Sequence, residues 1–320
     1  MAAELVAVKY IWKDGQLIDW EDAKVHVLSV AVQFGSSVFE GIRAYPTERG
    51  PAVFRLTEHL RRLHDSCKIY RMDLPWSIED LTRATAQLIA ANELASCYIR
   101  PMVLRGYGTA GLNPVGTSIE SYIAVYPWGT YLGEGALEQG VDVCVSNWFR
   151  PHPNTFPAMA KAAGHYNSSQ LIKADAVTKG FAEGIALAPD GTVSEGSGQN
   201  LFLVRDGELV TPPVNGTLLS GITRASVMAI AEDVGIRVRE RTIPREALYV
   251  ADEVFFTGTA AELTPVRSID HITIGTGRAG DVTKLLQRRF MDIAHGRVPD
   301  SFGWLTYVHD VLDRATVPVS

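Results

Sequence analysis

A glycine-rich stretch near the middle of the chain, residues 129–140, most constrains how the sequence can fold. It holds four glycines in twelve residues, a density typical of a flexible connection between two folded parts. The chain of 320 residues is also too long for one ordinary hydrophobic core. We therefore expect two domains, residues 1–128 and residues 141–320, joined by this loop. A pocket between two domains is a favoured place for a cofactor.

Composition and charge exclude several classes of protein. The net charge is −6 and no block of basic residues is present, so neither nucleic acid nor an anionic membrane is an expected partner. Three scattered cysteines are too few for a disulfide framework or a zinc site, and they fit a reducing cytoplasm. The sequence has no signal-peptide pattern and no apolar stretch long enough to span a bilayer. We expect a cytoplasmic protein without a bound metal.

Turn signals and hydrophobic periodicity predict helices and strands in both halves. Thr57 is expected to cap a helix, and Ser77 starts a capping-box pattern at the head of a second one. Gly180 is expected to end a helix in the second half. Two Asp-Gly pairs, at 190–191 and 206–207, lie between apolar runs and predict β-hairpins.

Lys161 lies in an unusual segment, PAMAKAAGHYNSS (residues 157–169), among alanines and a glycine, with Tyr166 five residues on. A lysine that attacks the carbonyl carbon of a flat aldehyde needs small neighbours, so that a ring can approach the backbone. It also needs a lowered pKa, which burial supplies. An exposed lysine at the start of an alanine-rich helix fits the same letters, so the segment alone leaves both interpretations open.

Two segments of the first half also suit a binding pocket. Residues 34–45, FGSSVFEGIRAY, place glycines beside aromatic rings, as a backbone passing close to a pocket would. Tyr98 and Arg100 alternate with apolar residues, so they share one face of a strand, where arginine could grip a carboxylate with two parallel bonds. A tight packing contact would explain residues 34–45 equally well. A solvent-facing pair at a sheet edge would explain Tyr98 and Arg100 equally well.

The second half contains one conspicuous carboxylate and two loops suited to an anion. Glu195 lies in a glycine-rich bend, where it either makes a turn without chemistry or faces a cationic partner. Gly221, Ile222 and Thr223 open a helix, whose free N–H groups favour an anion such as a phosphate, although an ordinary helix start fits too. The end of a strand at residues 258–261 gathers further backbone donors and a hydroxyl.

Other chemistries find little support in the sequence. It has no GxGxxG after a first strand, no Walker loop, no HExxH and no GxSxG. The eight histidines are dispersed. His165 lies near Lys161, where a lone histidine is more often a hydrogen-bonded structural group than a catalyst.

Seven segments in order resemble one family, the branched-chain amino acid aminotransferases, which are class IV aminotransferases of fold type IV with a pyridoxal 5'-phosphate cofactor. The resemblance covers nearly the whole chain. It implies an α/β (α+β) protein of two domains, a small α/β domain and a larger pseudo-barrel domain, with the site between them. The segments are VFEGIR (38–43), RLHDS (62–66), YIRP (98–101), AKAAGHY (160–166), SEGSGQNLF (194–202), LLSGITR (218–224) and GTAAELTPVRSID (258–270).

The resemblance implies a role for each matching residue around the cofactor. Lys161 would be the catalytic lysine that holds the cofactor as a Schiff base and carries the proton. Glu195 would face the pyridine nitrogen, and Tyr166 would bond the phenolic oxygen of the ring. Leu219 would pack against a face of the ring, and Gly196 would leave room at the other end of the site. The phosphate would be held by Arg62, Ile222, Thr223 and Thr259.

The resemblance also assigns the substrate side of the site. Tyr98, with the N–H groups of Thr259 and Ala260, would take the α-carboxylate, and Arg100 the distal carboxylate of glutamate. The active unit would be at least a homodimer, or a hexamer, because Ala110 and Leu112 would come from the partner subunit. The side-chain pocket would be lined by Phe34, Phe39, Gly41, Arg43 and Tyr131.

These roles imply transamination of L-leucine, L-isoleucine and L-valine with 2-oxoglutarate by a ping-pong mechanism. The same fold type also hosts D-amino acid transaminases, R-selective amine transaminases and aminodeoxychorismate lyase. The intact FEGIR segment and the residues around Ala110 favour the branched-chain family. A non-catalytic protein that closes around a small anion is the alternative from a different class.

Position 34 departs from the family pattern, in which many members have a Tyr whose hydroxyl contacts the distal carboxylate. The loss of one hydrogen bond to a charged group costs about 1.5–3 kcal/mol. Phe34→Tyr is therefore expected to lower the Michaelis constants for glutamate and 2-oxoglutarate in steady-state kinetics. The prediction is wrong if neither constant improves.

Overall fold

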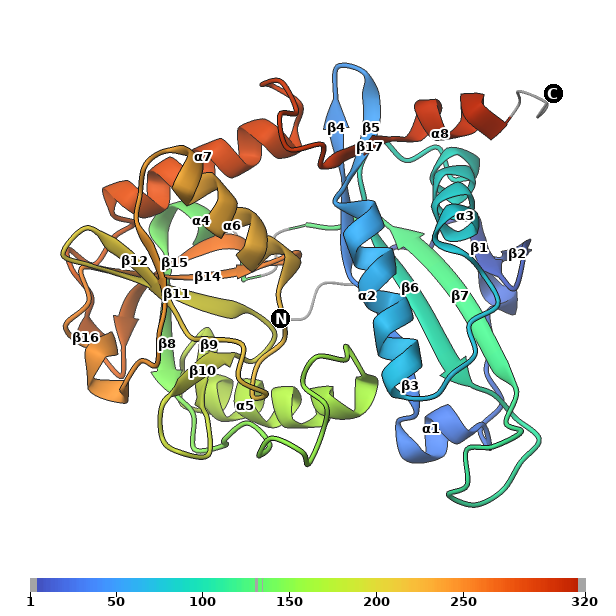
Figure 1. Ribbon diagram of the computed structural model, residues 1–320, viewed down its shortest axis with the longest axis horizontal. Helices are drawn as coiled ribbons and strands as arrows, with labels where there is room; N and C mark the ends of the chain where they lie inside the picture. The colour runs from blue at the N-terminus through green and yellow to red at the C-terminus, as the bar shows by residue number, and fades with distance from the viewer. Residues whose placement is uncertain (1–4, 130–131, 134, 316–320) are drawn as a thin grey trace. The chain divides into compact units, whose positions relative to one another are not determined.

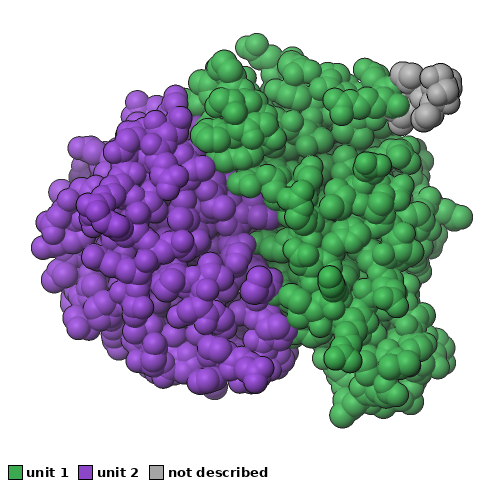
Figure 2. Space-filling model, in the orientation of Figure 1, with its two compact units in different colours: residues 1–129, 160–164, 292–320 green, residues 130–159, 165–291 purple. Residues whose placement is uncertain are grey.

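The computed structural model describes residues 5–129, 132–133 and 135–315, and these form two compact units (Figure 2). Unit 1 contains the described residues up to Gly129, together with Ala160–Gly164 and the described residues from Asp292 onward. Unit 2 contains the described residues between Gly129 and Ala160, together with His165–Met291. The units are thus interleaved along the sequence, and the domain limits expected at residues 128 and 141 remain a prediction.

Unit 1 is built on an antiparallel sheet of eight strands, in the order β17-β5-β4-β6-β7-β1-β2, with β3 paired to β6 (Figure 1). Its longest strands, β6 and β7, pair in register from Tyr98 opposite Tyr126 to Arg105 opposite Ile119. The strands are β1 (Tyr10–Lys13), β2 (Gln16–Asp19), β3 (Ser37–Phe39), β4 (Ile42–Thr47), β5 (Gly50–Phe54), β6 (Cys97–Arg105), β7 (Ile119–Tyr126) and β17 (Leu305–Tyr307).

Helices α2, α3 and α8 cover one face of this sheet, because their apolar residues recur at helical spacing and pack into a single core. The helix α1 and the short η1 lie on the other face, where Ala31 and Trp20 pack against strand residues that alternate with those of the main core. Leu60, Leu63 and Cys67 of one helix are buried there, as their spacing predicts. A smaller apolar cluster around Ile11 and Leu104 lies on the sheet as well. The helices are α1 (Val30–Phe34), α2 (Leu56–Ile69), α3 (Ile78–Ala91), α8 (Val308–Ala315) and the short 3-10 helix η1 (Trp20–Asp22).

The helix starts of unit 1 match the prediction in one case and differ in the other. The Ser77 hydroxyl accepts from the Asp80 N–H at 3.1 Å, and the Asp80 carboxylate accepts from the Ser77 N–H at 3.1 Å, so the capping box is confirmed. The predicted cap at Thr57 is wrong, since α2 already begins at Leu56. Arg55 occupies the cap position with φ of 55°, and it makes no side-chain capping bond.

Unit 2 is built on a mixed sheet of nine strands, in the order β10-β9-β8-β15-β14-β11-β12-β13, with β16 paired to β15 (Figure 1). Strand β8 runs parallel to both its neighbours, and β12 runs parallel to β13. The strands are β8 (Val141–Val145), β9 (Glu183–Leu187), β10 (Val193–Gly196), β11 (Asn200–Arg205), β12 (Glu208–Thr211), β13 (Val238–Glu240), β14 (Glu253–Gly258), β15 (Glu262–Ile269) and β16 (Ile272–Thr273).

The turn signals of the second half are confirmed. Asp206 and Gly207, with φ of 51° and 76°, join β11 to β12, and the first Asp-Gly pair joins β9 to β10. Gly180, with φ of 85°, follows the end of α5. The helices are α4 (Ala136–Gln139), α5 (Tyr166–Thr178), α6 (Ile222–Asp233), α7 (Asp281–Ala294) and the 3-10 helices η2 (Ala163–His165) and η3 (Arg245–Leu248).

Two further features follow from these elements. None of the helices in the described ranges combines the length and the apolar character needed to cross a membrane. The three cysteines are buried, and burial raises the pKa of Cys67 and Cys97 to about 12, so both thiols are protonated at neutral pH.

The core of unit 1 offers a direct test of this packing. Leu60 of α2 is completely buried, so Leu60→Ala is expected to lower the free energy of unfolding by about 2–5 kcal/mol through lost burial and a residual cavity. The neighbouring residue Arg61 is exposed, and Arg61→Ala is expected to change it by no more than about 0.5 kcal/mol. Denaturant unfolding measures both, and equal losses would contradict the assigned packing.

Candidate active site

The backbone around Lys161 is held firmly by unit 1. The Lys161 N–H donates to the Ser66 hydroxyl of α2 at 3.0 Å, and the Lys161 carbonyl accepts from the Phe39 N–H at 3.0 Å. Ala162 forms a β-bridge with Val38 and belongs to the same hydrophobic core. These contacts explain why residues 160–164 group with unit 1. Any movement of the amine must therefore come from the Lys161 side chain.

The Lys161 side chain is half-buried between small neighbours. Ala160 and Ala162 are both buried, and the Lys161 Nζ lies 5.0 Å from the centre of the Phe39 ring. Helix α5 begins only at Tyr166, so an exposed lysine at a helix start is not what the structure contains. The alanines give a flat molecule room to approach the amine, as the sequence suggested.

Arg62, one turn before Ser66 on α2, is bound to a buried carboxylate. Glu40 follows β3, is completely buried, and accepts from Arg62 Nε at 2.7 Å and from Arg62 Nη2 at 2.8 Å. The Glu40 carboxylate also lies 2.7 Å from His59 Nδ1. Arg62 is therefore not a plain surface charge.

The aromatic and arginine residues expected for the substrate side gather on β3, β4 and β6 of unit 1. The Arg100 guanidinium lies over the rings of Phe39 and Tyr98, with its Cζ 4.7 and 5.1 Å from their centres. Arg43 lies opposite Tyr98 in the β4–β6 pairing. Gly41 packs so closely against the Tyr98 hydroxyl that a Cβ there would overlap with it. The glycine therefore allows a tight packing contact with β6, and a pocket beside this segment stays a prediction.

Four other residues expected near the substrate are exposed or lie outside the described residues. Phe34 ends α1 and is 49% exposed. Ala110 and Leu112 lie in the loop between β6 and β7, and Leu112 is 83% exposed. Tyr131 lies outside the described residues. Among the expected residues, unit 1 brings together Phe39, Gly41, Arg43, Tyr98 and Arg100.

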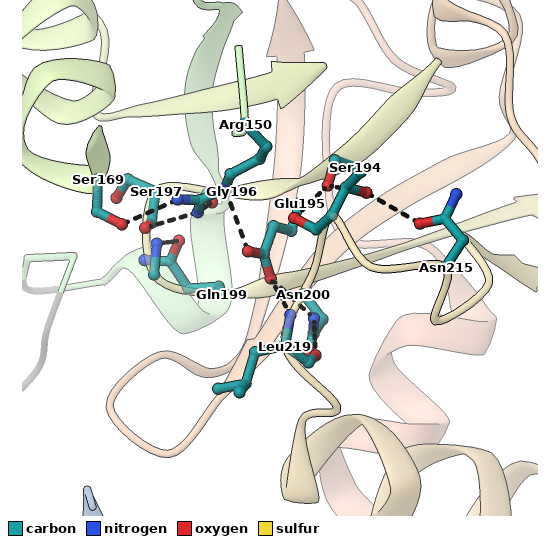
Figure 3. A network of polar contacts seen from close by, with 12 residues as sticks. Arg150, Ser169, Ser194, Glu195, Gly196, Ser197, Gln199, Asn200, Asn215 and Leu219 are labelled. Carbon is teal, nitrogen blue, oxygen red and sulfur yellow. Dashed lines mark hydrogen bonds and ion pairs between the residues drawn. The ribbon is translucent and has the colours of Figure 1, made fainter. Parts of the chain in front are cut away.

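The candidate site of unit 2 centres on Glu195 at the end of β10 (Figure 3). One carboxylate oxygen lies 3.1 Å from Arg150 Nε. The other accepts from Asn200 Nδ2 at 3.1 Å and from the Leu219 N–H at 3.4 Å. Only 12% of the Glu195 side chain is exposed. A cation and two N–H donors around one buried carboxylate favour its ionised form.

Arg150 connects Glu195 to the neighbouring backbone. Its Nη2 donates to the carbonyls of Gly196 at 2.5 Å and Ser197 at 2.9 Å, and its Nη1 donates to Ser169 of α5 at 3.0 Å (Figure 3). The guanidinium is thus fixed by three acceptors besides the carboxylate, and it fixes the bend in turn. Of the two interpretations left open for Glu195, a turn without chemistry and a carboxylate that faces a cation, the structure contains the second, and the cation is Arg150.

The other residues of unit 2 that were expected around the cofactor lie at or near the ends of its helices and strands. Helix α6 begins at Ile222, so Ile222 and Thr223 lie in its first turn. The residue at its N-cap, Gly221, makes no side-chain capping bond to this turn. Thr259 and Ala260 form the turn between β14 and β15, and Tyr166 opens α5. Gly196 is tightly packed: a Cβ there would lie 2.6 Å from Gln199 Oε1. Leu219 is joined to Glu195 through its own N–H.

His165 has the character expected of a structural group. Burial, together with the charge of Arg150, lowers the pKa of His165 to about 4, so the imidazole is neutral at pH 7. Its ring makes an edge contact with Phe156, with centroids 5.2 Å apart.

Sequence reasoning assigned no role to four residues of these clusters: His59, Ser66, Arg150 and Asn200. His59 lies one helical turn before Arg62, and Asn200 lies in the same motif as Glu195, so spacing could have drawn attention to both. Arg150 follows β8 in a proline-broken loop, where no pattern marks a single arginine.

Comparisons with known proteins decide which family has this arrangement. The family model for amino-transferase class IV matches residues 37–269. The chain is 52% identical to a branched-chain-amino-acid aminotransferase of Escherichia coli (strain K12), covering 94% of this chain and 97% of that one. The chain belongs to the class IV aminotransferases. The expected membership of this family and the α/β fold are thereby confirmed.

Further class IV aminotransferases show the same similarity. A branched-chain-amino-acid aminotransferase of Pseudomonas aeruginosa is 43% identical, over 93% of this chain and 97% of that one. The crystal structure of the Escherichia coli enzyme has a TM-score of 0.93 at 52% identity, covering 94% and 99% of the two chains. The crystal structure of a branched-chain amino acid aminotransferase from Thermobaculum terrenum, in its PLP-form, has a TM-score of 0.87 at 33% identity, covering 94% and 99%.

The close approach of Gly41 to Tyr98 predicts a specific effect on this aminotransferase. In Gly41→Ala the added methyl group must displace the Tyr98 hydroxyl, so the Michaelis constant for the amino-acid substrate is expected to rise about tenfold, or about 1.4 kcal/mol. Gly198→Ala is the matched control, because a Cβ there meets nothing within 4 Å. Similar Michaelis constants for the two variants would show that Tyr98 has no part in substrate binding.

Proposed function

We propose that the chain is a pyridoxal-phosphate-dependent transaminase of L-leucine, L-isoleucine and L-valine, with 2-oxoglutarate as the amino acceptor. The names of its relatives support the substrate class. The observation that carries the cofactor is the buried Glu195 carboxylate, held by Arg150, Asn200 and the Leu219 N–H. Such an anion complements the protonated nitrogen of a pyridine ring.

The described residues fit this cofactor at each of its polar groups. Lys161 offers an amine among alanines, and Glu195 offers an anionic carboxylate. The uncapped first turn of α6 after Gly221 offers N–H groups suited to a phosphate. When bound, the cofactor supplies an aldehyde that takes up an amino group and a ring that withdraws electrons.

Lys161 is the proposed catalytic base. Its Nζ would take the proton from the α-carbon of the substrate and hold it until it is donated to the carbon on the other side of the substrate nitrogen. The bonds from Ser66 and Phe39 fix its backbone, so the transfer needs only rotations of the side chain. Tyr166 bonds the phenolic oxygen of the ring, while Glu195 keeps the ring nitrogen protonated. Leu219 and Gly196 shape the space beside them.

Phosphate and carboxylates are held by separate groups in this proposal. Arg62, the N–H groups of Ile222 and Thr223 and the Thr259 hydroxyl take the phosphate. Tyr98, with the N–H groups of Thr259 and Ala260, takes the substrate α-carboxylate. Arg100 takes the distal carboxylate of glutamate, for which its place over two aromatic rings is suited. Phe34, Phe39, Gly41, Arg43 and Tyr131 accept the aliphatic side chain.

Both half-reactions use the same groups in succession. The amino acid would be converted to its 2-oxo acid in the first and 2-oxoglutarate to glutamate in the second, and the bound cofactor would supply the carrier of the amino group between them. We further propose a homodimer in the cytoplasm as the minimal active unit, with a hexamer as the larger alternative. The exposed loop that carries Ala110 and Leu112 supports this, because it is available to complete a second copy's site.

The role of Lys161 is tested by Lys161→Ala, with Lys68→Ala, an exposed lysine on α2, as the control. The Lys161 variant is expected to lose both the visible absorbance of the Schiff base and transaminase turnover, whereas the control keeps both. Absorbance spectra and single-turnover assays measure these properties. A Lys161 variant that keeps its absorbance would contradict the proposal, and a wild type that binds the cofactor without turnover would be the anion-binding protein.

A substrate panel separates the relatives that share the fold. L-amino acids, D-amino acids and R-amines are each mixed with the protein in its pyridoxal-phosphate form, and the change in cofactor absorbance is followed. We expect conversion with the branched-chain L-amino acids. Conversion with D-amino acids or R-amines alone would instead favour those transaminases.

A further inference from the structure

Glu40 has no assigned role, yet it is among the most completely buried charged residues of unit 1. Its side chain is 0% exposed, and it accepts hydrogen bonds on both oxygens: from Arg62 Nε at 2.7 Å on one, and from Arg62 Nη2 at 2.8 Å on the other. The second oxygen also lies 2.7 Å from His59 Nδ1 and accepts from the Gly41 N–H at 3.3 Å. A single carboxylate thus joins β3, the following turn and α2.

Two of the three side chains in this cluster, Glu40 and Arg62, are charged, and His59 is neutral. Burial favours protonation of Glu40, but the charge of Arg62 and the hydrogen bonds from Arg62 and His59 outweigh it and hold the pKa of Glu40 well below its usual range. Burial lowers the pKa of His59 against the opposing pull of Glu40. His59 is therefore a neutral imidazole that donates its Nδ1–H to an ionised carboxylate. The net charge of the three side chains is close to zero.

Stability alone is a weak reason for such a cluster. Removing two charges from water costs several kcal/mol per ion, and apolar side chains of similar volume often stabilise a core equally well. The bidentate contact instead fixes orientation, since the planar guanidinium and the carboxylate meet along two parallel bonds. His59 then holds the carboxylate itself in place from the same helix.

The geometry of Arg62 sets where its other donors point. A guanidinium is a rigid planar fork with five N–H groups. Glu40 occupies the edge made by Nε and Nη2, so the Nη1 donors are directed away from the carboxylate. The Arg62 side chain is 12% exposed, in contrast to Glu40. The cluster thus binds one edge of the guanidinium to Glu40 and fixes the direction of its Nη1 donors.

The same turn of α2 also holds the lysine segment. The Ser66 hydroxyl donates to the Arg62 carbonyl at 2.8 Å and accepts from the Lys161 N–H at 3.0 Å. One turn of helix therefore sets the position of the guanidinium and of the Lys161 backbone together.

We propose that Glu40, supported by His59, is the positioning residue that aims Arg62 at the phosphate group of the cofactor. This inference rests on the proposed function, which places a phosphorylated cofactor at Lys161. Because the Glu40 side chain is completely buried, it would act through Arg62 and not by contact with the cofactor or substrate. Its contribution is therefore confined to ligands that carry the phosphate.

The test compares two ligands of the full-length apoprotein: pyridoxal 5'-phosphate and pyridoxal, which lacks the phosphate. Both engage Lys161 and Glu195, so only phosphate recognition separates them. In Glu40→Gln the dissociation constant for pyridoxal 5'-phosphate is expected to rise at least about tenfold, from the loss of charge-assisted bonds that hold Arg62. The constant for pyridoxal is expected to stay within about twofold. Titration of the visible absorbance measures both.

Matched variants separate positioning from a general loss of structure. Glu58→Gln removes a carboxylate of the same helix that pairs with Arg55, and it is expected to leave both constants unchanged. In an Arg62→Ala background, Glu40→Gln is expected to add no further loss. His59→Leu is expected to weaken only the phosphorylated ligand, and His59→Asn, which restores a donor near the place of Nδ1, is expected to recover it. The His59 pair also serves if Glu40→Gln does not fold.

The inference is overturned if Glu40→Gln leaves the affinity for pyridoxal 5'-phosphate unchanged, or if it weakens both ligands by the same factor. A further loss in the Arg62→Ala background would overturn it too. A different result would contradict the proposed function: the wild-type protein itself would bind neither ligand at Lys161. The inference about Glu40 would then be wrong as well.

Discussion

The candidate site depends first on how the backbone of Lys161 is held. Two hydrogen bonds, one from its N–H to Ser66 and one to its carbonyl from Phe39, fix the lysine between α2 and β3. A long side chain on a fixed backbone can move its amine over several ångströms while its starting point stays constant. Precise placement of this kind is what proton transfer between two neighbouring atoms requires. The neighbours Ala160 and Ala162 are small, and larger side chains at these positions would fill the space beside the amine.

Each unit also contains a buried carboxylate paired with an arginine, and the two pairs differ in a useful way. In unit 1 the carboxylate, Glu40, is sealed and the arginine is the more exposed partner. In unit 2 the order is reversed: Arg150 is tied to three protein acceptors, and Glu195 is the partner with more exposed surface. The first arrangement presents a positive group and the second a negative one. An anionic group on a ligand complements the first, and a protonated ring nitrogen complements the second.

Much of the fold could be predicted from the sequence because its signals are local. The capping box at Ser77, the turn at Asp206 and the stop at Gly180 each depend on residues within a few positions of one another. The buried face of α2 follows from its spacing of apolar residues. The start of α2 was harder to predict, because Arg55 adopts a left-handed backbone conformation that is uncommon for arginine.

The candidate residues Lys161 and Glu195 could also be found from sequence, because they lie in distinctive segments. Their partners could not. Arg150 is 45 positions from Glu195 along the chain, and nothing in its loop distinguishes it from a surface arginine. The grouping of residues 160–164 with unit 1 depends on long-range contacts with β3 and α2, which only the folded chain reveals. What could not be predicted from the sequence was which residues distant along the chain are in contact, whereas the candidate residues themselves could be identified by their type and segment.

The pairing of β17 with β5 has a consequence for biosynthesis. Leu305 lies opposite Phe54, so the sheet of unit 1 is completed by a strand that follows all of unit 2 in the sequence. While the polypeptide is still emerging from the ribosome, the edge of β5 stays open, and unit 1 cannot finish folding until unit 2 has been translated. An unpaired edge of this kind is a template for pairing with other chains. The nascent protein is therefore exposed to aggregation for longer than a chain whose units fold one after the other.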